Sequence, residues 1–370
     1  MKIRRVGVCD LDGLAVRLHH RASSLAEELV EEILLRVPPD EPGHLVRASL
    51  VCKAWHSILS DDTFRRRYRR FHGTPPLQGY FCNDFSDSTV RFVPTISVAT
   101  ASPVCALRLD DSCGQKPLAL DCRHGRVLIL IEANDNGRLI VWDPIAGSQR
   151  HLSLPTYMQY PCWYNHAGAV LCAKDGCDHL DCHGGPFLVV LVGTRLDYAY
   201  KEGGDVQTWA SMYSSETDVW SSPTTPHDEA NQYVDDRRPG LLIGDALYYT
   251  TIFGKYNIVK YDLRKHELSV MHLPVEFQSI RVAKKEFQSI LIKGNDGALG
   301  VAAMSRNCIY MWSWQGENKG IGGWVKYRVM ELDDMLLSKG DLICMAEGTN
   351  TVFIGVERTG VFTLDLRSRQ

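Results

Sequence analysis

An apolar helical segment near the amino terminus, residues 23–71, constrains this chain more than any other feature. It opens with Ser24 and Glu27, whose Ser-x-x-Glu spacing is the capping box that starts many helices. Apolar residues then recur at three- and four-residue steps, which places them on one side of a helix. They form two neighbouring stripes: Leu25, Leu29 and Ile33, and beside them Val30, Leu34 and Val37. Two prolines, Pro38 and Pro39, end this helix.

Two further helices are predicted in the same segment. One covers residues 44–59, where apolar side chains, Trp55 among them, again recur at three- and four-residue steps. The other begins at Asp61 or Asp62. The aromatic side chains on its inner face are expected to be Phe64, Tyr68 and Phe71.

Three helices of this size enclose little interior, and so small a unit is marginally stable alone. The first helix nevertheless carries more apolar side chains than one local core can bury: Leu25, Ala26, Leu29, Val30, Ile33, Leu34, Leu35 and Val37. One stripe can serve the local core. The surplus predicts either a partner protein or packing against the downstream domain, and the residues alone leave both open.

The segment resembles an F-box, the motif that docks substrate receptors onto the Skp adaptor of a cullin–RING ubiquitin ligase. The matching pieces are Leu25-x3-Leu29, the run from Glu32 to Pro38, Leu50-Val51-Cys52-Lys53-x-Trp55, and residues 61–64. One position departs from the family pattern, which usually has proline where this chain has Ala26. Alanine is a good helix former, so we expect docking to be weakened at most. The resemblance implies adaptor contacts by Leu25, Leu29, Ile33, Leu34, Val51, Cys52 and Trp55.

After the glycine and prolines of residues 73–76, the pattern changes from helical spacing to two-residue alternation. Short strands are predicted every ten residues or so, for example over 126–131, 138–143 and 360–365. Many short strands without a long amphipathic helix indicate an all-β domain. The predicted organisation is a flexible leader (1–22), the F-box (23–72), a linker (73–79) and the β domain (80–370).

A repeated hairpin indicates how the β domain is built. Asp143 follows an apolar–aromatic pair and precedes a strand that ends at Pro155, and Asp262 stands in the same relation to Pro274. Residues 362–366 form a third, partial copy. Aspartate suits the turn and proline the strand end, so equivalent hairpins far apart suggest radial repeats. At roughly 45–50 residues per blade, about six propeller blades fit residues 76–370.

The β region is similar to the propeller-like domain that follows the F-box in many plant, especially grass, F-box proteins. The similar stretches are 141–155, 213–221, 244–249 and 261–274. The predicted fold is therefore α+β and multidomain, with a small three-helix F-box followed by an all-β propeller-like domain of about six blades.

Composition and charge exclude several classes of function. The net charge of −3 implies no attraction to nucleic acid or membrane surfaces, and no apolar run approaches a bilayer's thickness. The leader alternates charged and apolar residues, unlike a signal peptide. A reducing compartment, cytoplasm or nucleus or both, is expected, where the 12 cysteines are mostly free thiols.

One cysteine-rich loop poses a choice between zinc and plain packing. Cys162, Cys172, Cys177, His179, Cys182 and His183 lie close in sequence. Thiolates and imidazoles bind zinc, but structural sites usually use paired knuckles with a second pair well downstream. We therefore interpret these residues as a reduced loop between blades, with no metal and no cofactor.

Catalytic patterns are missing from the sequence: there is no Gly-x-Ser-x-Gly elbow, Walker loop or His-Glu-x-x-His. The predicted function is non-catalytic, with no catalytic residue. We expect the substrate-recognition subunit of an SCF-type ubiquitin ligase, which contacts a Skp-type adaptor, a cullin through it, and an unknown target protein. The alternatives are a binding scaffold that engages no ligase and, less favoured, a propeller enzyme.

Overall fold

The structure is a computed structural model. It describes residues 27–39, 43–73, 77–84, 89–95, 107, 116–132, 137–155, 158, 164–179, 182, 184–197, 205–226, 232–252, 257–274, 276, 289–294, 296–305, 307–316, 323–332, 340–356 and 359–367. The predicted leader, the capping residue Ser24, Leu25 and Ala26 lie outside these residues. Of the helices described, none is both long enough and apolar enough to cross a membrane.

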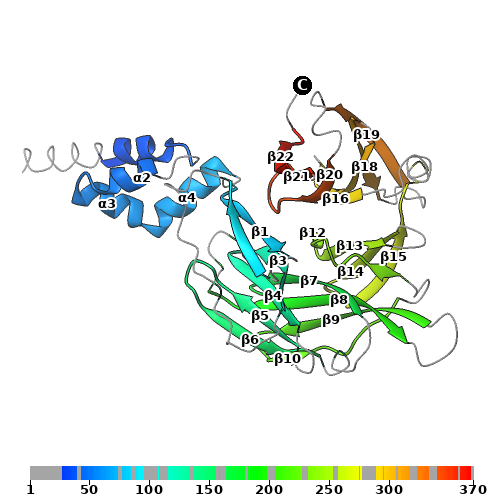
Figure 1. Cartoon of the computed structure of the whole chain (residues 1–370). Helices are drawn as coiled ribbons and strands as arrows, with labels where there is room; N and C mark the ends of the chain where they lie inside the picture. Colours follow the sequence, from blue (N-terminus) through cyan, green and yellow to red (C-terminus); the bar gives the residue numbers. More distant parts are fainter. Residues whose placement is uncertain are drawn as a thin grey trace, which may run out of the picture. The chain divides into compact units, whose positions relative to one another are not determined.

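The described residues fall into two compact units. A helical unit holds those up to Tyr80 together with 93–95, and a β unit holds the rest. The helical unit contains a first helix at residues 27–35 and three more helices, α2 (Gly43–Ser49), α3 (Lys53–Ser60) and α4 (Asp62–His72) (Figure 1). The prediction of three helices is therefore wrong, because the segment 44–59 forms two helices instead of one.

The break between α2 and α3 has a local backbone cause. Leu50 and Val51 donate their N–H groups to carbonyls only three residues back, at 3.1 and 3.2 Å, which tightens the end of α2. Cys52 is then fully extended, with φ −160° and ψ 166°, and α3 starts anew after it. The sequence has neither glycine nor proline at this break. The spacing of apolar residues therefore predicted one continuous helix where the structure has two.

A small core holds the four helices together. Its fully buried side chains are Leu34, Leu35 and Phe64, and partly buried residues from every helix pack around them: Val30, Ala48, Trp55, Ile58, Leu59 and Tyr68. The predicted start of α4 is confirmed, since the carboxylate of Asp61 accepts the N–H groups of Thr63 and Phe64 at 2.8 and 3.0 Å. Phe71 was expected to face inward and instead is 55% exposed.

The β unit consists of antiparallel sheets that follow one another in chain order (Figure 1). Their strands form five blades. The first contains β3 (Lys116–Arg123), β4 (Arg126–Glu132), β5 (Arg138–Trp142) and β6 (Gln149–Ser153). The second contains β7 (Tyr164–Cys172), β8 (Phe187–Asp197), β9 (Asp205–Ser214) and β10 (Val219–Trp220).

The remaining three blades complete the series. The third contains β11 (Tyr233–Val234), β12 (Leu241–Ile243), β13 (Ala246–Ile252), β14 (Asn257–Asp262) and β15 (Glu267–His272). The fourth contains β16 (Ser289–Lys293), β17 (Leu299–Ser305), β18 (Cys308–Gln315) and β19 (Gly323–Glu331). The fifth contains β20 (Asp341–Met345), β21 (Thr351–Val356) and β22 (Gly360–Asp365).

The all-β propeller expectation is confirmed, but the estimate of about six blades is wrong. Before β3, the described residues contribute only the two-stranded sheet of β1 (Gly79–Asp84) and β2 (Thr89–Pro94). The second blade also uses unusually long strands, eleven residues in β8 and ten in β9. Dividing the length by an average blade therefore overestimates the number of blades.

The repeated aspartate hairpin is confirmed as a structural unit. The Asp143 carboxylate accepts two backbone N–H groups at 2.9 Å, and Asp262 accepts two at 3.0 and 3.1 Å. Asp365 accepts one, at 2.8 Å. In the three blades concerned, each aspartate lies at the end of β5, β14 or β22 and holds the turn that follows.

A buried ion pair links the blades at their inner strands. The Arg123 guanidinium in β3 bonds Asp121 at 2.8 Å and Glu347, just beyond β20, at 2.9 Å. It also donates to the carbonyl of Gly240 beside β12, and Asp121 accepts the N–H of Val170 in β7 at 2.9 Å. Arg123 thus connects three blades directly, and Asp121 adds the second blade through Val170. Because Arg123 and Asp121 are both buried and Glu347 pairs with Arg123 from the surface, the network acts as a structural tie.

Candidate functional site

The first helix divides its apolar residues between two directions. Leu34 and Leu35 are 2% and 3% exposed in the core, whereas Leu29 and Ile33 are 64% and 63% exposed. This is the separation that the two stripes predicted, with one stripe serving the core. The side chains of the exposed stripe remain in contact with water, so burying them against a partner's apolar surface would be favourable.

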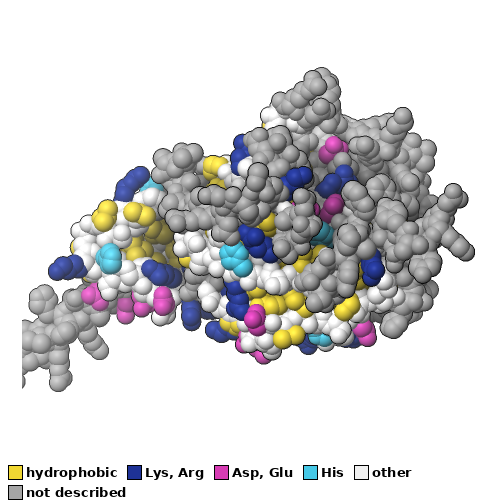
Figure 2. All heavy atoms as spheres, turned by 60° about the horizontal axis from the view of Figure 1, so that its bottom comes forward, with side chains coloured by type: hydrophobic (Ala, Val, Ile, Leu, Met, Phe, Trp, Pro, Cys, Tyr) yellow, Lys and Arg dark blue, Asp and Glu magenta, His cyan; other side chains and the backbone are white. Residues whose placement is uncertain are grey.

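The end of α2 adds a second exposed apolar group. Val46, Leu50 and Val51 are 60%, 79% and 63% exposed, and none of them packs against the core of the helical unit. Together with Leu29 and Ile33 they form what we call the exposed apolar set. Figure 2 shows hydrophobic side chains at the surface of the helical unit, next to basic and acidic groups.

The residues predicted to bind the adaptor differ in how far they are exposed. Leu29, Ile33, Val51 and Cys52 are exposed, and Leu25 lies outside the described residues. Leu34 is buried and Trp55 packs against the core, so both support the fold that presents the exposed set. Val46 and Leu50 were missing from the prediction, because the helix expected over residues 44–59 did not reveal the break that follows α2.

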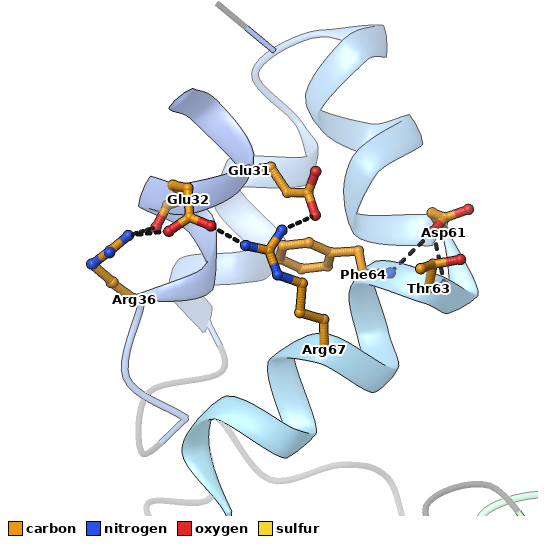
Figure 3. Close-up of polar contacts among 7 residues, drawn as sticks. All are labelled: Glu31, Glu32, Arg36, Asp61, Thr63, Phe64 and Arg67. Carbon is orange, nitrogen blue, oxygen red and sulfur yellow. Dashed lines mark hydrogen bonds and ion pairs between the residues drawn. The ribbon is translucent and has the colours of Figure 1, made fainter. Parts of the chain in front are cut away.

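Ion pairs fix the first helix against α4. Arg67 bonds Glu31 at 2.7 Å and also bonds Glu32, which in turn accepts Arg36 at 2.8 Å (Figure 3). The hydrogen bond from Arg36, assisted by Arg67, holds the pKa of Glu32 below its ordinary value. The hydrogen bond to Glu31 raises the pKa of Arg67. The short arginine run of α4 is therefore partly engaged in holding the helices together.

Two further bonds tie α4 to the end of the first helix. The Tyr68 hydroxyl donates to the carbonyl of Val37 at 2.6 Å, and the His72 ring lies 2.8 Å from the carbonyl of Leu35. These bonds satisfy backbone carbonyls that the helix end leaves without a helical partner. The exposed apolar set thus stands on a frame held by both packing and polar contacts, suited to binding a partner's apolar surface.

A second grouping of chemically active side chains lies in the β unit. Cys172, Cys177, His179 and Cys182 come together, with their ligand atoms within 4.8 Å of one another. A backbone hydrogen bond from His179 lowers the pKa of the Cys177 thiol. The other two members of the predicted loop, Cys162 and His183, lie outside the described residues.

Comparison with known families identifies both regions of the chain. The family model described as "F-box protein AT5G49610-like, beta-propeller" matches residues 119–362, more than half of the chain. The chain belongs to this family of F-box proteins. A model of the F-box domain matches residues 22–67, which contain most of the helical unit. The resemblance noted from the sequence is thereby confirmed for the F-box and for the propeller.

Relatives come from a plant. The putative F-box protein At5g41510 of Arabidopsis thaliana is 24% identical over 209 residues, which cover 55% of this chain and 48% of that protein. The putative F-box protein At5g41500 of the same plant is 25% identical over 207 residues, with the same coverage. This F-box protein thus aligns with about half the length of the curated relatives it matches.

Solved structures give only distant likenesses. The Dos1 propeller superposes with a TM-score of 0.36 at 10% identity and covers 66% of this chain and 55% of its own. TolB from Acinetobacter baumannii superposes with a TM-score of 0.39 at 12% identity, covering 83% and 69%. Scores this low carry no argument about fold or function.

Proposed function

We propose that this F-box protein is the substrate-recognition subunit of an SCF-type cullin–RING ubiquitin ligase. In this proposal the F-box docks on a Skp-type adaptor and through it on a cullin, while the propeller binds a target protein. The subunit itself makes and breaks no bond. It acts by proximity, since holding a target near a charged ubiquitin carrier raises the effective concentration of the reacting groups.

The observation that carries the proposal is the exposed apolar set. Leu29, Ile33, Val46, Leu50 and Val51 are all at least 60% exposed, on a unit whose described residues include three buried apolar side chains. Large apolar side chains in the middle of an interface usually supply most of its binding energy. The F-box match over residues 22–67 assigns this surface to the motif for which adaptor docking is the expected use.

The test is co-purification with a Skp-type adaptor. Leu29→Asp and Leu50→Asp each place a charge where an apolar contact is expected, so each should reduce adaptor binding by at least about 30-fold, the equivalent of about 2 kcal/mol. Both side chains are exposed and outside the core, so the F-box should keep its fold. Trp55→Ala is a poorer probe because it also removes core packing.

A matched control is Val219→Asp in β10. Val219 is 60% exposed, comparable to Leu29, but belongs to the propeller. It should leave adaptor binding unchanged. If the Leu29 and Leu50 variants retain full binding, or the control loses as much, the adaptor does not use this surface, and a scaffold independent of the ligase becomes the better account.

The proposed function also predicts the cellular compartment of the protein. The eight cysteines that the structure describes are all free, which suits a ligase subunit in a reducing compartment, the cytoplasm or the nucleus. Imaging of a fluorescent fusion of the full chain tests this, and accumulation in the secretory pathway would contradict it.

A further inference from the structure

We propose that the loop between β7 and β8 binds one zinc ion through Cys172, Cys177, His179 and Cys182. The inference rests on the geometry of this loop and does not depend on the ligase proposal. The sequence favoured a plain reduced loop because the cysteine spacing matched no standard zinc motif. The pairing of β7 with β8 nevertheless brings the four side chains close together in space.

The hairpin itself creates the site. Cys172 is the last residue of β7 and pairs directly with Phe187, the first residue of β8. The base of the loop is closed by a hydrogen bond from Ala173 N to Pro186 O at 3.0 Å. The chain leaves one strand at Cys172 and returns past Cys182, so ligands from both sides of the loop meet.

The distances fit a tetrahedral site after slight contraction. Zinc bound by thiolate at about 2.3 Å and by imidazole at about 2.0 Å holds neighbouring ligand atoms roughly 3.5–3.8 Å apart. Cys182 Sγ already lies 3.8 Å from His179 Nδ1, and all four ligand atoms lie within 4.8 Å of one another. The largest closure that the ion requires is therefore about 1 Å.

The surrounding backbone holds the ligands in place. Lys174 donates its N–H to Cys172 Sγ at 3.4 Å, a contact that helps to hold this sulfur in position. Gly176 and His179 both adopt left-handed backbone conformations, with φ of 61° and 56°, and the second is unfavourable for a side-chain-bearing residue. A bond to a metal would offset that strain by fixing the imidazole inward.

Groups from the first blade support the loop from behind. Arg126 donates to the carbonyls of Cys182 at 2.7 Å and Gly185 at 2.6 Å. The ring of His124 lies 4.3 Å from that of His179, between centroids. The first blade thus contacts both the backbone of the loop and the ring of one proposed ligand.

The ligand types favour zinc in a structural role. Three thiolates and one imidazole suit zinc, and four protein ligands leave no open position for substrate. Binding releases the three thiol protons to solvent, so the occupied site carries a net charge of −1. The ion would tie the long loop of the second blade to the end of β7 and stabilise that blade without taking part in any reaction.

The experiment measures zinc in the full-length chain, purified under reducing conditions without chelator and dialysed. We expect about one zinc per chain by mass spectrometry of the metal. Removing a direct ligand should cost more than the 10–100-fold typical of an outer-shell change, so Cys177→Ser and His179→Ala should weaken zinc affinity at least about 100-fold. Cys308→Ser removes a thiol in β18, outside the cluster, and should change nothing.

Two further measurements keep the test decisive if a variant folds poorly. His179→Cys supplies a fourth thiolate and should retain zinc. Cobalt added to the metal-free chain should give the thiolate charge-transfer bands and strong visible bands of a tetrahedral site. The proposal is overturned if the folded chain takes up neither metal, if the cluster forms a disulfide under these conditions, or if Cys308→Ser loses zinc as Cys177→Ser does.

Discussion

The F-box and the propeller use their apolar residues in opposite ways. Among the described residues, six large apolar side chains are exposed in the helical unit and six in the far larger β unit. The helical unit buries three apolar residues fully, whereas the propeller buries apolar clusters throughout its blades. The propeller therefore buries most of its large apolar side chains within itself, whereas the F-box leaves a large share of its own exposed.

This difference indicates where a partner has the most to add. A unit with a small core is marginal alone, and a ligand that binds only the folded form stabilises it by mass action. The F-box should therefore gain stability from its adaptor, whereas the propeller should be stable by itself. Substitutions that separate core from surface in each unit test the comparison.

The largest effect is expected in the propeller, from Arg123→Met. Breaking a buried ion pair typically costs about 3–5 kcal/mol, because the remaining charges stay buried without a partner. Here the variant leaves the buried Asp121 without its cation and removes the contacts to Glu347 and Gly240. Chemical unfolding of the full chain, followed by propeller tryptophan fluorescence, should show this loss.

The matched control is Arg264→Met. Arg264 pairs with Asp245 at 2.8 Å, but both side chains are exposed, at 79% and 57%. Such surface pairs contribute no more than about 1 kcal/mol. If the two variants lose equal stability, the network around Arg123 does not tie the blades together.

A second pair of variants compares neighbours in the first helix of the F-box. Leu34→Ala should cost about 2–5 kcal/mol of stability, since it opens a cavity in a core whose buried members among the described residues are Leu34, Leu35 and Phe64. Ile33→Ala should cost less than about 0.5 kcal/mol, because the side chain is 63% exposed. Thermal unfolding of the helical unit, monitored by circular dichroism, measures both.

Binding should rank these two variants differently. Ile33→Ala should weaken adaptor binding while the unit stays folded, and saturating adaptor should restore part of the stability that Leu34→Ala loses. If Ile33→Ala destabilises the unit as strongly as Leu34→Ala, the exposed stripe is part of the core and the comparison between the two units fails.

Features that depend on contacts between residues close in sequence could be predicted from the sequence alone. Helical spacing separated Leu29 and Ile33 from Leu34, because the side chains of one helix keep a fixed angular order. The aspartate turns were equally local, since Asp143 bonds residues only two and three positions ahead. Local hydrogen bonds and local periodicity are legible in a single sequence.

Features that depend on contacts between residues far apart in the sequence, or on a break without a helix-breaking residue, could not be predicted. The extended Cys52 that divides α2 from α3 leaves no composition signal, and so Leu50 was not recognised as part of the exposed set. The cysteine cluster needs the pairing of β7 with β8 to bring Cys172 near Cys182. Arg123 meets Glu347 only once the blades have assembled.

The smallest effect is expected from the cap of α4. The hydrogen bond from the Phe64 N–H, with that from Thr63, holds the pKa of Asp61 below its ordinary value. A carboxyl with a lowered pKa in the folded state stabilises that state above its unfolded pKa, and this contribution is lost as the pH falls through the folded pKa. Asp61→Ala should lower the melting midpoint of the F-box by a few degrees at neutral pH.

Asp61→Asn separates the cap from its charge. Asparagine can accept the same two N–H groups, so most of the stability should remain at neutral pH, but it does not titrate. The difference between wild type and Asp61→Asn should therefore shrink as the pH falls below the ordinary range of aspartate, while the propeller transition serves as an internal reference. If that difference stays constant across the acid range, the charge of Asp61 adds nothing to the cap, and the cap stabilises α4 through its two hydrogen bonds alone.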